Sequence, residues 1–524
     1  MSTFMDHRLT RRTFVKSAGA STAIAATLLA SSSSSAQEAT PTASSGLDWG
    51  RFDTSIETAQ STFDMVGVAV SVVVGDEIAY RRMFGVRDLE TGTPVTPETH
   101  FLVASTTKSM TSLLVATYVD EGVLDWDQRV REVFPDFRAP TAELTDTLRV
   151  RDMLNMSSGI GEPDAVSAFH QGDPTTPQLL QMLSGLPVIG APGDQFFYNG
   201  TVYSVGGYLP ALALGVDPSE IGSTYASQMS ERVYGPTGMS SARIADDPRP
   251  FTAEYATGYG PDFSHGTARQ PFAPVGSYAP AGGTLATHDE MTRYVMMQLN
   301  RGVANDGTRV VSEKNLAECW ASNVDVPFDT ETNPDLVRSG YGMGWLDFTY
   351  RGGRRLVSHA GGIDGFTTFL ALLPDDGIGL VVNTNVGPLS RGLGYVQYVS
   401  ALFVETLYGL NIGAADAAVS QYRAAAQALT DLAAAATPAD EAKIAAWIGF
   451  YERGWSLGFD DVGTLLLRQS SRAIPILALP DGSYVMASGV APGAVVQFVT
   501  DASGMPAMEI VGLETVRWMT GESP

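Results

Sequence analysis

The sequence predicts an α+β protein: a large domain whose antiparallel sheet is assembled from both of its ends, followed by a small all-β domain. Two strand-like runs, residues 66–75 and 77–86, precede a middle part, residues 105–300, whose pattern is mostly helical. Four more strand-like runs return between residues 344 and 385. Because a sheet has to bury its apolar face, we expect the helices of the middle part to pack on it.

Length and composition place the chain among globular proteins. Its 524 residues are enough for a large and a small domain, each with its own core. The hydrophobic share of 44% and the charged share of 17% are ordinary for folded proteins. The net charge of −24 argues against nucleic acid as a partner, because phosphate binding needs a basic surface. We interpret this acidity as a contribution to solubility.

The N-terminal residues carry the features of an export signal. A twin-arginine motif, Arg11-Arg12, precedes an apolar run from Ala18 to Ala30 and a serine-rich segment. Thirteen helical residues span about 20 Å, which is too short for a hydrocarbon core of about 30 Å. We therefore expect a signal peptide cleaved after Ala36, export by the twin-arginine pathway to the periplasm or the exterior, and no stable membrane insertion after cleavage. The alternative is an uncleaved membrane anchor.

Turn sequences and composition divide the rest of the chain. Gly75-Asp76 joins the first strand pair and Pro374-Asp375-Asp376-Gly377 the last, both in residues typical of tight turns. Residues 413–436 are rich in alanine and prone to helix, which we interpret as part of a linker. The predicted parts are a signal peptide (1–36), a linker (37–50), the large domain (51–410), an alanine-rich linker (411–440) and a small all-β domain (441–524).

The strongest candidate for chemistry is the stretch Ser105-Thr106-Thr107-Lys108. Lys108 is one of only four lysines, and it follows Ser105 by three positions in what should be the first turn of a helix, so the two side chains share a face. A serine becomes nucleophilic when a base takes its proton, and a lysine can do so once burial lowers its pKa. A GxSxG elbow, a phosphate-binding lysine after glycine and an HxxxH pair are all missing from the sequence.

The segments around this stretch resemble the serine β-lactamase-like family. The resemblance covers about residues 51–405 and is carried, in the family's order, by VASTTKSM, LRVRDMLNMSSGI, APGDQFFYNGTVYSVGGYL, APAGGTLATHDEM and YGMGW followed by SHAGGIDGF. The family includes class C β-lactamases, D-alanyl-D-alanine carboxypeptidases, D-aminopeptidases and esterases. The resemblance implies a β-lactamase/transpeptidase-like fold for the large domain and a reaction that needs no metal or organic cofactor.

The resemblance also implies roles for particular residues. Ser105 would be the acylated nucleophile, and Lys108 its base or proton relay. Tyr198 matches the tyrosine of the second motif and would carry a proton between Ser105 and the leaving group. His359-Ala360-Gly361 matches the third motif. The backbone amides of Ser105 and Gly362 would form the oxyanion hole.

Two positions depart from the family pattern. The second motif is usually Tyr-x-Asn, but here Gly200 stands where the asparagine is expected, and the side chain of Asn199 should point elsewhere. At the third motif, His359 replaces the lysine of many β-lactamases, and a neutral imidazole binds a carboxylate less strongly. Both departures favour an esterase over a β-lactamase.

We therefore expect an exported serine hydrolase that cleaves an ester or amide through a Ser105 acyl-enzyme. The alternative is a catalytically weak penicillin-binding or sensing module that keeps the fold. Which small-molecule ester, peptide or β-lactam is the substrate, what the all-β domain does, and how many copies assemble stay open. We expect Tyr203 and Trp345 to be core aromatics, His288 to begin a helix and Cys319 to be buried. The loop at 251–280 either lines the pocket or forms an ordered surface excursion.

Overall fold

The computed structural model describes most of the chain from residue 49 onward. The described residues are 49–162, 174–263, 266–272, 274–328, 335–408, 414–469, 472–489, 492–501, 504–511 and 514–520. The expected export signal (1–36) and residues 37–48 of the expected linker lie outside the described residues. Its last two residues, 49 and 50, belong to helix α3 (Trp49–Thr62). Within the described part, no helix is both long enough and apolar enough to span a bilayer.

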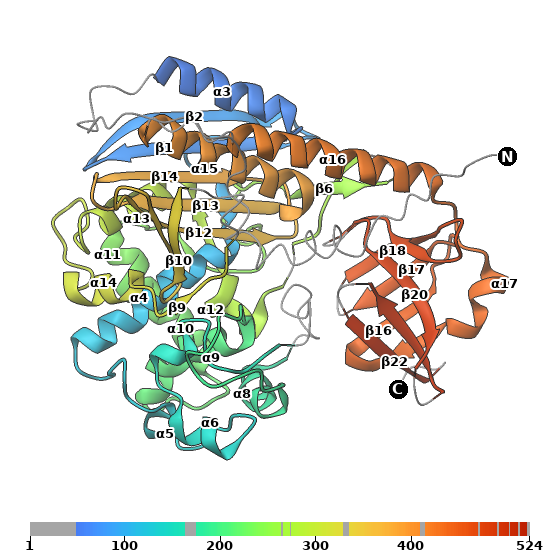
Figure 1. The fold of residues 1–524 in the computed structure, drawn as a ribbon, viewed down its shortest axis with the longest axis horizontal. Coiled ribbons are helices and arrows are strands. Elements are labelled where there is room, and N and C mark those ends of the chain that lie inside the picture. The colour runs from blue at the N-terminus through green and yellow to red at the C-terminus, as the bar shows by residue number, and fades with distance from the viewer. Residues whose placement is uncertain are drawn as a thin grey trace.

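The largest sheet joins strands from the two ends of the large domain, as the sequence predicts (Figure 1). β1 (Gly67–Val74) pairs antiparallel with β2 (Glu77–Asp88) on one side and with β14 (Ile378–Thr384) on the other. The nine strands run in the order β3-β2-β1-β14-β13-β12-β11-β10-β9. The bounds of the others are β3 Thr93–Pro94, β9 Val324–Asp325, β10 Leu336–Tyr341, β11 Leu346–Tyr350, β12 Arg355–Ile363 and β13 Phe366–Leu373.

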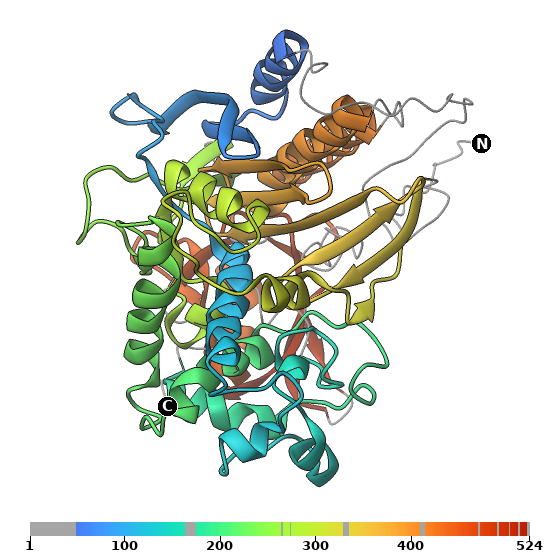
Figure 2. The same ribbon diagram turned by 90° about the vertical axis from the view of Figure 1, so that its left-hand side faces the viewer.

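Helices cover both faces of this sheet (Figure 2). α3 and α15 (Leu393–Tyr408) lie on one face, and α13 (His288–Leu299) lies on the other, where Gly379 of β14 approaches Val295 so closely that an added Cβ would collide with it. Because both faces are covered, successive residues of β1 are buried without alternation, unlike the strands of a sheet with one solvated face.

The middle of the chain is mainly helical, with two small sheets. Tyr203 and Trp345 are fully buried in the core of the large domain, Cys319 is buried, and His288 begins α13, as we expected. Besides α13, the α-helices of four or more residues in this part are α4 Thr107–Asp120, α5 Val130–Val133, α6 Ala142–Thr147, α8 Thr176–Met182, α9 Gly200–Ala213, α10 Ile221–Met229, α12 Ala279–Gly282 and α14 Glu313–Trp320; the strands are β4 His100–Leu102, β5 Arg243–Ile244, β6 Tyr259–Asp262, β7 Gly266–Arg269 and β8 Thr284–Thr287.

The C-terminal part is all-β, as predicted, and the structure adds that its eight strands close into a barrel. Apolar side chains fill the barrel interior, among them the fully buried Trp455, Leu467 and Val496. Closure removes the free edges that an open sheet of this size would present. The strands are β15 Gly449–Tyr451, β16 Trp455–Phe459, β17 Leu465–Gln469, β18 Arg472–Ala478, β19 Tyr484–Met486, β20 Val495–Thr500, β21 Pro506–Ile510 and β22 Glu514–Thr520.

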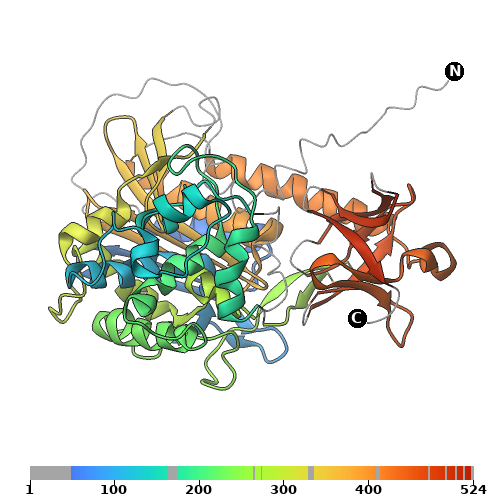
Figure 3. The ribbon, with the colours of Figure 1, turned by 90° about the horizontal axis from the view of Figure 1, so that it is seen from below.

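The alanine-rich segment is a 22-residue helix, α16 (Ala414–Ala435), which runs from the large domain to the barrel (Figure 3). We expected a linker here. The helix does connect the two parts, but its first residues, Ala414 and Ala418, are buried. Near its other end, Leu429 lies against Gly493 of the barrel. The segment therefore packs at both ends rather than spanning open solvent.

A second connection runs through the loop at 251–280, which folds partly into the β6–β7 hairpin. The amide of Phe263, at the tip of this hairpin, donates to the carbonyl of Ala487 in the barrel (3.1 Å). At its base, Tyr259 bridges to Val386 behind β14. This part of the loop is an ordered excursion that contacts the barrel.

Candidate active site

Ser105 stands at a turn where a strand gives way to a helix. β4 ends at Leu102, a short 3₁₀ turn covers Ala104–Thr106, and α4 begins at Thr107. Ala104 has φ +50°, a left-handed conformation that is strained for a residue with a Cβ and that clusters at functional sites. Ser105 is partly exposed, so its hydroxyl is open to a reactant.

Lys108 lies one turn further on, beneath Ser105. Its ammonium nitrogen is 3.2 Å from Ser105 Oγ and donates to the carbonyl of Ala281 at 2.7 Å. The side chain is only 2% exposed. Burial lowers the pKa of Lys108 to about 7, against the opposing negative charge of Glu162. A substantial fraction of the amine is therefore neutral at physiological pH, which is what a proton acceptor for Ser105 requires.

Tyr198 completes a group of three side chains. Its phenol is close enough to Ser105 for that hydroxyl to lower the pKa of Tyr198, and the Lys108 nitrogen lies 4.8 Å from the centroid of its ring. Burial raises the pKa of Tyr198 above its usual range, so the resting phenol keeps its proton. On the other side of Lys108, the Tyr203 hydroxyl donates to the Lys108 carbonyl (2.7 Å) and fixes the backbone of the helix there.

His359 is neutral and its two ring nitrogens are occupied. Nδ1 lies 2.6 Å from the Ala360 carbonyl, which can only accept, so Nδ1 carries the proton. Nε2 then accepts from the Tyr341 hydroxyl at 3.2 Å. Burial, and secondly the charge of Lys108, lower the pKa of His359 to about 3. The ring therefore offers neither a charge nor a free N–H, in line with the neutral imidazole that we expected at this position.

The strand that carries His359 lies directly against the Ser105 turn. β11 pairs with β12 only as far as Ser358, whereas β13 pairs with β12 through to Ile363, so the described strands leave one edge of residues 359–363 unpaired. At this edge, a Cβ on Gly361 would lie 3.1 Å from the amide nitrogens of both Ser105 and Thr106 and would collide with the Val103 carbonyl. Only glycine permits this approach. Gly362, next along, is exposed.

The second motif departs from the family pattern as the sequence indicates, and the structure shows what Asn199 does instead. Its Oδ1 accepts from the Val202 amide (2.8 Å) and caps α9, while its Nδ2 donates to the carbonyls of Ile160 and Gly161. Asn199 is thus used up in holding the helix start and does not reach Ser105 as a substitute amide.

Sequence reasoning missed Glu162. Its carboxylate accepts from the amides of Gly200 (3.1 Å) and Thr201 (3.3 Å) and from the Thr201 hydroxyl. It is 6% exposed and close enough to Lys108 for each charge to shift the other's pKa. Nothing in the local pattern marks this residue, because it meets Gly200 only through the tertiary fold.

A second serine–histidine arrangement is present but enclosed. Ser71 Oγ lies 2.7 Å from His288 Nε2, and His288 Nδ1 lies 2.8 Å from Asn383 Oδ1. All three side chains are fully buried between β1, β14 and α13. No reactant reaches them, so the group cross-links the sheet to α13 and is not a competing nucleophile.

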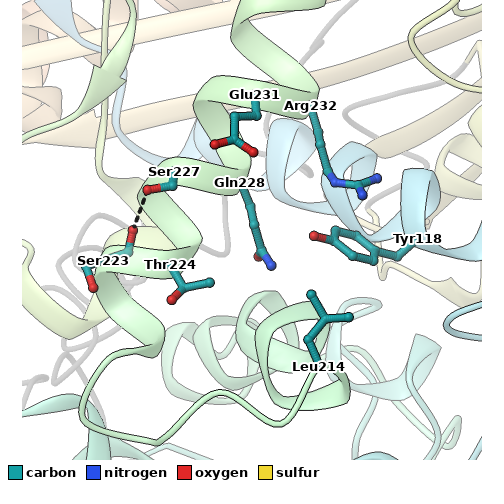
Figure 4. Close-up of a pocket in the computed structure, with 8 residues that line it drawn as sticks. All are labelled: Tyr118, Leu214, Ser223, Thr224, Ser227, Gln228, Glu231 and Arg232. Carbon is teal, nitrogen blue, oxygen red and sulfur yellow. Dashed lines mark hydrogen bonds between the residues drawn. The ribbon is translucent and has the colours of Figure 1, made fainter.

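A surface cavity of about 460 Å³ lies apart from the Ser105 site (Figure 4). Arg232 on its rim pairs with Glu121 and lies over the Tyr118 ring, so its charge is already matched. The eight lining residues include none of the predicted site residues: Tyr118, Leu214, Ser223, Thr224, Ser227, Gln228, Glu231 and Arg232. Across the described ranges, no cluster of three or more acidic, histidine or cysteine side chains is placed to hold a metal ion.

Comparisons with known proteins agree on one family. The Beta-lactamase family model matches residues 52–399. Penicillin-binding protein 4 of Amycolatopsis lactamdurans is 27% identical over 330 residues, which cover 61% of this chain and 81% of that protein. The D-alanyl-D-alanine-carboxypeptidase/endopeptidase AmpH of Escherichia coli K12 is 24% identical, with 62% and 80% covered.

Other relatives are matched over less of their length or by fold alone. Unguisins hydrolase ungD of Aspergillus violaceofuscus is 25% identical over 64% of this chain, and the match spans only 61% of that hydrolase. Among solved structures, the octameric penicillin-binding protein homologue from Pyrococcus abyssi superimposes with a TM-score of 0.60 at 21% identity, covering 90% of this chain and 100% of that one. At this identity, the structural match supports the fold.

Proposed function

The chain belongs to the beta-lactamase family and is a serine hydrolase, and from this premise we propose that it cleaves an ester or amide bond through an acyl-enzyme on Ser105. The observation that carries the proposal is the buried Lys108 amine, 3.2 Å from Ser105 Oγ, with its pKa lowered to about 7. A lysine held in this state takes a proton that a solvated lysine would not.

In the proposed reaction, Ser105 Oγ attacks the substrate carbonyl carbon as its proton passes to Lys108 Nζ. The bond to the leaving oxygen or nitrogen then breaks, and the proton reaches the leaving atom through Tyr198. Water next attacks the acyl-enzyme, its proton returns along the same route, and the acid is released with Ser105 restored. The amides of Ser105 and Gly362 bind the oxyanion, and each such donor contributes about 3 kcal/mol to the transition state.

The neutral His359 narrows the class of substrate. A cation at this position would bind a carboxylate on the substrate, but both ring nitrogens are occupied and the pKa of about 3 keeps the ring uncharged. We infer that the scissile ester or amide has no carboxylate next to it that must be recognised. The absence of a side-chain amide at Gly200 removes a donor that would hold the carbonyl of a β-lactam or peptide, and this favours an ester over these amides.

We also propose that the protein acts outside the cytoplasm, on the strength of the twin-arginine motif and the short apolar run behind it. Fractionation of cells that make the full chain, with Arg11-Arg12 changed to Lys-Lys as the control, tests this part. Retention of the wild-type protein in the cytoplasm would exclude it.

The test of the catalytic proposal is Ser105→Ala. We expect hydrolysis of a p-nitrophenyl ester to fall to the buffer rate and labelling by a fluorophosphonate to disappear. Intact-protein mass spectrometry separates the two functions considered: turnover of esters supports the hydrolase, whereas slow stoichiometric acylation by penicillin without release supports the sensing module. Ser71→Ala is the matched control, because that enclosed serine should leave labelling unchanged. Labelling that survives in Ser105→Ala contradicts the mechanism.

A further inference from the structure

We propose that Glu162 is a positioning residue whose carboxylate, fixed at the start of α9, sets the proton balance between Lys108 and Ser105. The proposal rests on the function given above, because it assigns a role to a residue acting through Lys108. Three observations carry it: the way the carboxylate is held, the charges that face it, and the residue type at position 200.

The carboxylate is fixed by donors and not by an ion pair. The Gly200 amide donates to Oε2, and the Thr201 amide and hydroxyl donate to Oε1. These amides belong to the first turn of a 14-residue helix, where the aligned peptide dipoles favour a negative charge. Burial raises the pKa of Glu162, and these donors act against that rise while they hold the carboxylate in one place on a rigid element.

The groups that face this charge belong to the candidate active site. In the described part of the structure, the carboxylate acts electrostatically on Lys108 of α4, on the phenol of Tyr198 just before α9, and on the phenol of Tyr278 before α12. Lys108 Nζ lies 4.8 Å from the ring centroid of Tyr198, two positions before Gly200, whose amide donates to the carboxylate. Lys108 in turn also faces the Tyr203 ring and His359, both uncharged. Burial alone would push Lys108 toward its neutral form, and Glu162 is the carboxylate that opposes this. Two buried groups of opposite charge titrate as a coupled pair.

The departure from the family pattern at position 200 involves Glu162 directly. In the family pattern, an asparagine at this position would present a side-chain amide to the lysine. Gly200 presents only its backbone N–H, and that N–H is taken by Glu162. Lys108 thus lacks the neutral amide of the family pattern, and a carboxylate bound to the Gly200 amide acts on it electrostatically instead.

The test is the pH dependence of Ser105 labelling by a fluorophosphonate. For the wild-type protein, we expect the second-order rate to rise through an inflection near pH 7, as Lys108 loses its proton. Glu162→Gln keeps the shape of the side chain but removes the charge that stabilises the protonated amine. The inflection should then move down by about one pH unit. Glu162→Asp keeps the charge and should restore an inflection within a few tenths of a unit of the wild-type value.

A matched control separates charge from helix capping. Glu290 is also 6% exposed and also caps a helix, accepting from the amides of Thr287, Ser241 and Ala242, but it lies at α13, away from Lys108. Glu290→Gln should lower the melting temperature as Glu162→Gln does and leave the inflection in place. A profile for Glu162→Gln that coincides with the wild-type profile would overturn the proposal and leave Glu162 as a helix cap only.

Misfolding of Glu162→Gln and absence of Ser105 labelling would have different consequences. If Glu162→Gln does not fold, Thr201→Val takes its place, because it removes one donor from the carboxylate and should move the inflection downward by a smaller amount; an unmoved inflection overturns the proposal. If the wild-type protein is not labelled, or if Ser105→Ala is labelled equally, the proposed function itself fails, which is distinguishable from a failure confined to Glu162.

Discussion

At the scale of single residues, the site combines a buried base, Lys108, with a nucleophile, Ser105, that is open to the substrate. Lys108 is 2% exposed, whereas Ser105 and Tyr198 are partly exposed. Ser105 is therefore open to the substrate, while the amine stays in surroundings that favour its neutral form. The pKa of about 7 follows from this arrangement, and it has a consequence for stability as well as for chemistry.

Replacing Lys108 by Met should reveal that consequence. The folded pKa of Lys108 lies below the value of about 10.4 in an unfolded chain, so between pH 7 and 10 the unfolded state binds the additional proton and the folded state gains stability as the pH rises. We expect the free energy of unfolding of the wild-type protein to rise relative to that of Lys108→Met by about 1.4 kcal/mol per pH unit in this window. Activity should fall by about 10²- to 10⁴-fold.

Denaturant unfolding of both proteins at pH 7 and pH 9 measures the effect, and the difference between them cancels groups common to both. His359 does not interfere, since its pKa of about 3 lies far below the window. Parallel pH dependences for the two proteins would show that the buried amine does not titrate as we infer.

The Ser105–Lys108 pair could be predicted because its geometry is local. Three positions in the first turn of a helix bring two side chains to one face whatever the rest of the chain does. The role of Glu162 could not be predicted, because 38 positions separate it from Gly200 and only the tertiary fold brings them together. The role of Asn199 could be predicted only in part. A helix start near this position could be expected, but the capping contact itself depends on the folded helix.

At the scale of elements, the meeting of β12 with the turn at Ser105 decides the shape of the site. The closest point is Gly361, whose Cα faces the amides of Ser105 and Thr106. A strand of a sheet is a rigid support, so it fixes the amides of the turn relative to its own free edge. This contact joins the end of the large domain to its beginning.

Gly361→Ala should therefore separate the two elements. The added methyl group collides with backbone atoms, which cannot rotate away, so the strand or the turn has to move. We expect kcat/KM for a p-nitrophenyl ester to fall by about 10²-fold or more, since a displacement of about 1 Å at reacting atoms has that effect. Steady-state kinetics measures it.

Gly282→Ala is the control for this prediction. Gly282 of α12 faces the same turn from another side, but there a Cβ would lie 3.7 Å from the Ala104 carbonyl carbon, which is an ordinary contact. Its kinetics should stay within a few-fold of the wild-type values. Equal losses in both variants would mean that the turn tolerates no change of any kind, and that the contact of Gly361 is not special.

Strands were harder to predict than helices wherever the partner lies far away in the chain. The apolar runs of β1, β13 and β14 are plain in the sequence, but β9 and β3 are only two residues long and leave no periodic signal. The closure of the barrel depends on β15 pairing with β22, and about 65 residues separate these strands. Alternation within each strand predicts an all-β unit without showing that its ends meet.

At the scale of the whole molecule, α16 and the β6–β7 hairpin hold the barrel against the large domain. A Cβ added to Gly493 would lie only 2.6 Å from the side chain of Leu429 in α16, and the Phe263 amide donates to the Ala487 carbonyl. The hairpin base also lies beside the turn after β12, where Gly258 approaches Gly365 and Phe366. One loop thus touches both the barrel and the end of the strand that carries His359.

Leu429→Asp should loosen this attachment. The substitution puts a charge between α16 and the barrel where apolar surfaces meet, and we expect a loss of about 1–3 kcal/mol in the free energy of unfolding. Ester turnover at 25 °C should be unchanged, because α16 does not contact the Ser105 site. Differential scanning calorimetry measures the loss. Ala425→Asp, at an exposed position on the same helix, is the control and should be nearly neutral. Equal behaviour of the two variants would argue that Leu429 does not help to hold the barrel.

The pairing of β1 with β14 has a consequence for the way the protein is made. About 300 residues separate the two strands, and at 5–20 residues per second a ribosome needs roughly 15–60 s to add them. Throughout that interval one edge of the valine-rich strand β1 has no partner, and unpaired strand edges can pair with the same edge of other nascent chains. We therefore expect the nascent N-terminal half to need protection from self-association until residue 384 has been synthesised. A protein truncated before that residue should form inclusion bodies.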